Sequence, residues 1–151
     1  MIDDYAGYKA LFAGTGEAGA CIELGCLAHA RRKFFDLHPA NHSPIALAAL
    51  NRMAELYAVE AEAKTLSISE RQALRAEKCV STLASLYAWL VATSAKTTTG
   101  DATAKALDYS LKPWPALCRC AKTGHLPIDN NPPRIAFGLS PWTKKLAVCG
   151  L

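Results

Sequence analysis

Apolar residues recur at helical spacing along most of this chain, and the pattern predicts a mainly helical protein. Ser43-Pro44 suits a helix start, because serine caps the first turn and proline fits its first position. The apolar stripe that follows consists of Leu47, Leu50, Met53, Ala54 and Tyr57, with Arg52, Glu55 and Glu62 among the polar positions. We therefore expect an amphipathic helix, in which Tyr57 packs and Glu60 is solvated.

A second long helix is predicted from Ser67, because Ser67 and Glu70 match a capping box. Its apolar positions are Leu74, Val80, Leu83, Tyr87 and Leu90. A loop over residues 94–101 separates it from a further helix expected over Ala102–Leu111. Pro113 and Pro115 break that helix, and a short one resumes through "ALCRCAKTG".

The first part of the chain has a mixed pattern. "YAGYKALFAGTG" predicts a short helix, and the apolar run from about Cys21 to Ala28 is compatible with a buried strand. "RRKFFDLH" then reads as a basic helix that ends before Pro39. The predicted fold class is mainly α with a small β component, with too little sheet for a complete α/β domain.

Composition narrows the class of protein. The chain has 151 residues, 51% of them hydrophobic and 20% charged, and a net charge of +4, which suits one domain with a sizeable core. Its basic balance permits a nucleic-acid partner without requiring one. Neither a membrane-spanning run nor a signal peptide is expected, so the chain is assigned to the cytoplasm. The six cysteines lack paired CxxC spacing and are expected to be buried free thiols.

Four blocks carry a resemblance to a known family: "IDDYAGYKALF", "GCLAHARRKFFDLH", "SPIALAALNRMAELYAVEAEAK" and "ALDYSLKPWPALCRCAKTGHLPIDNN". In this order and spacing they resemble the transposases of the insertion sequence sixty-six family, often labelled TnpC, over roughly Ile2 to Asn131. The resemblance implies a DDE-type DNA transposase, the enzyme of a mobile element, with a ribonuclease-H-like α/β catalytic domain and a long helical portion. Such enzymes use three acidic residues to hold two magnesium ions, which activate the attacking oxygen and stabilise the leaving one.

The family's catalytic positions map only in part onto this chain. The second acidic residue, just ahead of the Tyr-x-Gly-Tyr motif, corresponds to Asp3, the candidate catalytic and metal-binding residue. Asp4 stands where a glycine is usual, and the first acid is expected upstream of Met1. The third, a glutamate three positions after the paired asparagines, is replaced by Arg134. The resemblance therefore places a partial catalytic domain over residues 1–131. The alternative for Asp3 is a solvated terminal acid or a helix-start residue.

Residues 132–151 form an irregular tail, for which we hypothesise a frameshift. A one-base deletion in codons for Asn-Pro-Ala-Glu-Asn-Arg yields Asn131-Pro132-Pro133-Arg134-Ile135, and a second loss near Trp142 accounts in the same way for the rest. The alternative is true divergence of a loop-rich tail. Sequencing the locus and translating all forward frames distinguishes the two.

A basic segment is the candidate DNA contact. His29, Arg31, Arg32 and Lys33 follow the predicted strand, and such side chains can bind phosphates without reading sequence. The alternative for the segment is a solvated basic helix face. His29 alone could also act as a catalytic base or metal ligand, and its simpler alternative is a hydrogen-bonded structural histidine. Asp129-Asn130-Asn131 is read as a helix cap rather than a metal site.

The expected function is therefore that of a transposase fragment that is inactive alone and has DNA as its partner. The alternative is a helical remnant that binds DNA, intact transposase or itself without catalysis.

Overall fold

The computed structural model describes residues 24–129 of the chain, and every regular element in this range is helical. The elements are α2 (Leu27–Asn41), α3 (Pro44–Glu62), the 3-10 turn η2 (Ala63–Thr65), α4 (Ile68–Ser94), α5 (Ala102–Leu111), α6 (Trp114–Cys118) and the 3-10 turn η3 (Arg119–Lys122). No helix in this part of the chain is both long and apolar enough to cross a bilayer.

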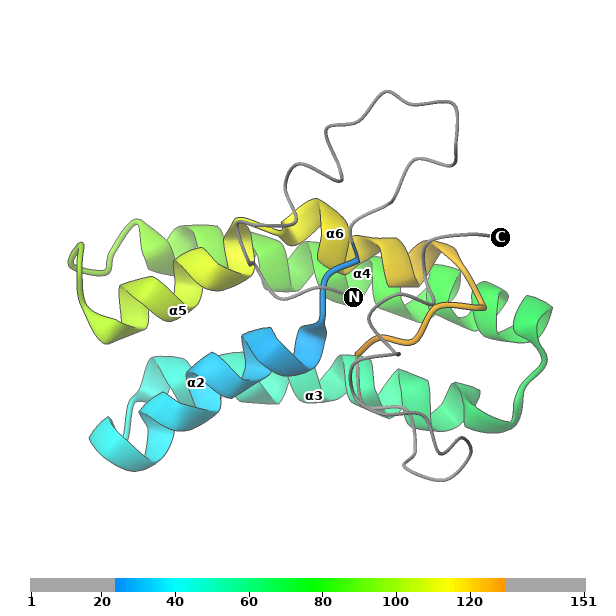
Figure 1. Ribbon diagram of the computed structural model, residues 1–151, viewed down its shortest axis with the longest axis horizontal. Coiled ribbons are helices and arrows are strands. Elements are labelled where there is room, and N and C mark those ends of the chain that lie inside the picture. Colours follow the sequence, from blue (N-terminus) through cyan, green and yellow to red (C-terminus); the bar gives the residue numbers. More distant parts are fainter. Residues whose placement is uncertain (1–23, 130–151) are drawn as a thin grey trace, which may run out of the picture.

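The four longer helices run up and down around one core. Helix α2 lies beside α3, and α4 lies beside α5, so that the two pairs form two layers (Figure 1). Each helix contacts the next along the chain, and α5 returns to contact α2. Short connections between antiparallel neighbours are typical of helical bundles. The largest fully buried apolar side chains are those of Phe34, Met53, Leu56, Leu86, Leu90 and Leu107.

The strand predicted from about Cys21 to Ala28 is wrong where the structure describes it. Residues 24–26 have no regular structure, and α2 begins at Leu27. Leu27, Ala30 and Phe34 are buried together at helical spacing, so the end of the apolar run belongs to α2 and not to a strand. The backbone N–H of Gly25 donates to the carbonyl of Ala116 over 3.0 Å, so this N–H has a hydrogen-bond partner without a sheet.

The described residues therefore contain no sheet, and the expected small β component is absent from residues 24–129. Helix α2 also continues through Pro39 to Asn41, rather than ending before the proline. Pro39 has no backbone N–H to donate to the helix. Because it lies only two residues before the end of α2, this loss affects the last turn alone.

Helix α3 starts as predicted, and Met53 is buried and Leu50 and Tyr57 are half-buried as expected, but the centre of the buried stripe is shifted. The Ser43 side chain accepts a hydrogen bond from the Ala46 N–H, and Pro44 occupies the first turn. Leu47, expected in the core, is 45% exposed. The buried positions are Ala46, Ala49, Met53, Leu56 and Val59. Both α2 and α4 pack against α3, and these neighbouring helices determine which stripe is buried.

Helix α4 repeats this outcome. The capping box is confirmed, because Ser67 and Glu70 each bind the other's backbone N–H. Val80 and Tyr87, both expected in the core, are exposed, and the buried stripe is Arg75, Cys79, Leu83, Leu86 and Leu90. An arginine in a stripe that is otherwise apolar is the unusual member.

The later elements agree with the sequence patterns. Helix α5 spans Ala102–Leu111 as predicted, with the Asp101 side chain accepting from the Thr103 N–H. The chain then forms α6 and η3 where a short helix was expected. Cys26, Cys79 and Cys120 are buried and form no disulfide with a described residue, as expected, whereas Cys118 is half-buried. Asp3 and the tail 132–151 lie outside the described residues.

Candidate nucleic-acid interface

One face of α2 carries two arginines and opens onto a groove. Ala28, Arg31, Arg32, Phe35 and Asp36 line this groove, which encloses about 600 Å³. They share a face because side chains three and four residues apart lie next to each other on a helix. Arg31, Arg32 and Phe35 are all exposed to solvent. The groove is therefore open and has both polar and apolar lining, with the Phe35 ring one helical turn after the two guanidinium groups.

The opposite wall joins two segments far apart in sequence. Ala54 and Tyr57 come from α3, and Asp129 lies near the end of the described chain. The Tyr57 hydroxyl donates a hydrogen bond to Asp129 Oδ2 over 3.1 Å. Burial raises the pKa of the Tyr57 hydroxyl, and the neighbouring Asp129 carboxylate raises it further. The hydroxyl thus stays protonated and keeps its role as a donor.

The start of α2 holds the Asp129 segment in place. The backbone N–H of Leu27 donates to the carbonyl of Ile128 over 3.2 Å. This bond satisfies a helix N–H that has no partner within α2. Since Ile128 immediately precedes Asp129, the same contact brings the carboxylate to the groove. Asp129 thus contacts Tyr57. The predicted role of Asp129-Asn130-Asn131 as a helix cap involves residues that lie outside the described range.

The four predicted DNA-binding residues do not share one surface. Arg31 lies over the Tyr57 ring, with its guanidinium carbon 6.0 Å from the ring centroid. Lys33 instead points toward α5, and its Nζ lies 5.1 Å from the centroid of Tyr109. His29 is half-buried and does not line the groove. Of the predicted residues, the structure brings together Arg31 and Arg32.

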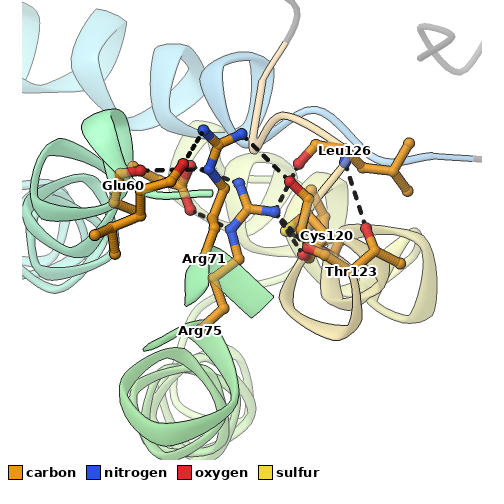
Figure 2. Close-up of polar contacts among 10 residues, drawn as sticks. Glu60, Arg71, Arg75, Cys120, Thr123 and Leu126 are labelled. Atoms are coloured by element: carbon orange, nitrogen blue, oxygen red, sulfur yellow. Dashed lines mark hydrogen bonds and ion pairs between the residues drawn. The ribbon is translucent and has the colours of Figure 1, made fainter. Parts of the chain in front are cut away.

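A buried ionic cluster, shown in Figure 2, fastens the segment that leads to the groove. Arg75 is 2% exposed, and its Nε and Nη2 donate to Glu60 over 2.7 Å each. Its Nη1 donates to three backbone carbonyls, those of Cys120, Thr123 and Leu126, over 3.1, 2.6 and 2.7 Å. One guanidinium therefore satisfies a carboxylate on α3 and ties residues 120–126 to α4.

Arg71 extends this cluster toward the start of α4. It donates to the carbonyls of Ala63, Leu66 and Gly124 over 3.4, 3.3 and 3.3 Å. The prediction that Glu60 is solvated was wrong, because its carboxylate pairs with Arg75 and is 19% exposed. Sequence reasoning missed Arg75 as well. The available signal was its position, since it precedes Cys79 and Leu83 at helical spacing in the apolar stripe.

The described residues do not form a metal site. Between residues 24 and 129, no group of three or more histidine, cysteine, aspartate or glutamate side chains is placed to hold an ion. Asp3, the candidate magnesium ligand, lies outside this range. Asp3 therefore stays a predicted magnesium ligand.

Comparison with known proteins covers almost the whole chain. The chain is 34% identical to the uncharacterized protein y4jD of Sinorhizobium fredii over 133 residues, which are 87% of this chain and 26% of that protein. It is 30% identical to y4hP and 35% identical to y4qI of the same organism, over 93% and 87% of this chain. The matches cover 29% and 25% of those two proteins, so the chain spans about a quarter of the length of these relatives.

No solved structure matches the chain. The family model described as "Transposase IS66 family" matches residues 1–133. This match includes all of the described helices and both walls of the groove, and the chain belongs to the IS66 transposase family.

Proposed function

We propose that this chain is part of an IS66 transposase, that its helical bundle binds DNA through the groove on α2, and that the chain alone does not cleave DNA. The family match supports a role in transposition. The observation that carries the DNA contact is the pair of exposed guanidinium groups, Arg31 and Arg32, on one wall of an open groove. The chain's net charge of +4 agrees with a polyanionic partner.

Guanidinium groups suit phosphate oxygens because their planar N–H donors match two acceptors at once. Arg31 is also oriented by the face of Tyr57, which limits the conformations that its long side chain must lose on binding. Contacts of this kind release counterions from DNA, so the affinity should fall as salt rises. They position a strand and carry no sequence information directly.

The cleavage chemistry of the family requires acidic residues around two divalent cations. In this chain Asp3 matches one acidic position of the family pattern, and Arg134 stands where a glutamate is expected. A guanidinium at that position would repel the cations that the carboxylate should hold. We therefore assign to this chain the part of a binding module, with catalysis requiring further carboxylates.

Fluorescence anisotropy with a labelled duplex tests the DNA contact. The double variant Arg31→Gln/Arg32→Gln should weaken binding, and the slope of log K against log salt should become shallower by about 0.9 for each phosphate contact that is lost. The matched control is Lys105→Gln/Lys112→Gln, which removes the same charge from exposed positions outside the groove lining. Equal losses in both double variants would show a non-specific charge effect and would overturn the proposed site.

A plasmid-nicking assay with added magnesium tests the proposed inactivity. The unmodified chain should leave supercoiled DNA intact. Nicking that disappears in the Asp3→Asn variant would overturn the proposal, because it would show a working catalytic site.

A further inference from the structure

The groove contains an exposed aromatic ring that phosphate binding does not use. Phe35 is 52% exposed, although its neighbour Phe34 is fully buried. Phe35 lies three and four residues after Arg32 and Arg31, so the ring and the two guanidinium groups occupy the same helix face. An aromatic face beside cationic groups is the combination that proteins use to bind single strands, in which bases are free to stack.

The carboxylates of the groove also disfavour a continuous phosphate backbone. Asp36 and Asp129 line the same groove as the two arginines. A duplex presents successive phosphates, and these carboxylates would repel a second phosphate placed near them. Amino groups on a base edge can instead donate to a carboxylate. A lining that mixes two guanidinium groups, two carboxylates and a ring therefore matches one nucleotide better than a run of phosphates.

The dimensions of the groove agree with a ligand of this kind. Its volume of about 600 Å³ lies within the range of roughly 300–1,000 Å³ that is usual for small-ligand pockets. The Tyr57–Asp129 hydrogen bond closes one side, and Arg31 rests on the Tyr57 ring. Two aromatic rings, Phe35 and Tyr57, belong to the described groove lining, and Arg31 covers that of Tyr57. The Phe35 ring is therefore the one left for a base to stack on.

We propose that the groove binds an unpaired nucleotide of a DNA strand, with its phosphate on Arg31 and Arg32 and its base stacked on Phe35. This inference rests on the proposed DNA-binding function and deepens it, because it names single-stranded DNA as the preferred ligand. Asp36 and Asp129 then accept hydrogen bonds from the base edge.

Anisotropy titrations of the full chain with a labelled single strand and with the duplex of the same sequence test this inference. Phe35→Ala should weaken single-strand binding about fivefold or more, which corresponds to about 1 kcal/mol or more of base stacking, and should leave duplex binding nearly unchanged. Phe35→Trp keeps a stacking face and should retain single-strand binding. The matched control is Leu47→Ala, which truncates another exposed apolar residue, 45% exposed, outside the groove lining.

The outcomes separate this inference from the proposed function. Equal losses on both DNA forms in Phe35→Ala, no loss on either, or a similar loss in Leu47→Ala or Phe35→Trp would overturn the unpaired-nucleotide site. The proposed DNA contact would still stand in these cases if Arg31→Gln/Arg32→Gln weakened binding. If that double variant left both affinities and the salt slope unchanged, the proposed function would fall and this inference with it.

Discussion

Replacing Arg75 by methionine should destabilise the bundle severely. The substitution leaves the Glu60 carboxylate without its bidentate partner and leaves three carbonyls without the donor that now binds them. Breaking a buried ion pair from one side costs about 3–5 kcal/mol. Because the Glu60 side chain is 19% exposed, water can partly solvate its unpaired carboxylate. We therefore expect the free energy of unfolding to fall by about 3 kcal/mol, the lower end of this range. A domain has a total stability of about 5–15 kcal/mol, so this loss is a large share.

Urea unfolding followed by circular dichroism measures this loss. The chain offers a control of similar chemistry, because Lys78 pairs with Glu62 over 2.8 Å between the same two helices. These side chains are 41% and 53% exposed, so Lys78→Met should leave the urea midpoint close to that of the unmodified protein. The double variant Glu60→Leu/Arg75→Met should recover part of the loss, since it removes the stranded carboxylate while the carbonyls stay unsatisfied.

Similar midpoints for Arg75→Met and Lys78→Met would refute the reasoning, because burial would then make no difference to the value of an ion pair. Full recovery in the double variant would refute only the expected contribution of the carbonyl hydrogen bonds. In that case the carbonyls of residues 120–126 would not need the Arg75 guanidinium.

Four further perturbations have defined outcomes. Gly124→Ala should lower the free energy of unfolding by at least about 1–3 kcal/mol, because its Cβ would lie 1.9 Å from the Ile68 carbonyl oxygen. Ser43→Ala should cost about 1 kcal/mol through loss of the α3 cap, and urea unfolding measures both variants. Burial raises the pKa of the Cys120 thiol to about 12, so iodoacetamide near neutral pH should modify it only after unfolding, as mass spectrometry can show. Because the unfolded thiol ionises near 9.0 and the folded one near 12, the contribution of Cys120 to stability should be lost as pH rises through this interval, which unfolding at several alkaline pH values measures.

Each of these expectations can fail independently. An unchanged midpoint in Gly124→Ala would mean that residues 123–126 move away from α4 at little cost. A Ser43→Ala variant as stable as the parent would show that solvent caps α3 equally well. Alkylation of Cys120 at equal rates in folded and unfolded protein would contradict its burial.

Local chemistry predicted where α3, α4 and α5 begin. Ser43-Pro44, the Ser67–Glu70 capping box and the start of α5 depend on bonds between residues two or three positions apart. Such bonds form within one turn and need no distant partner, so they can be read from the sequence. The basic residues of α2 were identified for the same reason, as a local cluster of charge. The family was likewise recognised from its motifs, and its match over residues 1–133 confirmed it.

The tertiary structure alone decided which faces are buried and which residues meet at the groove. Leu47 is exposed and Arg75 is buried because neighbouring helices, and not hydrophobicity alone, determine the packed surface. The Tyr57–Asp129 hydrogen bond joins residues 72 positions apart, and no local pattern encodes that contact. Helix geometry likewise directs Lys33 to α5 and Arg31 to the groove. The sequence by itself thus determined the starts of α3, α4 and α5, the charge and the family, because these depend on nearby residues. Which side chains are buried, and which distant residues contact each other, depends on how the helices pack together.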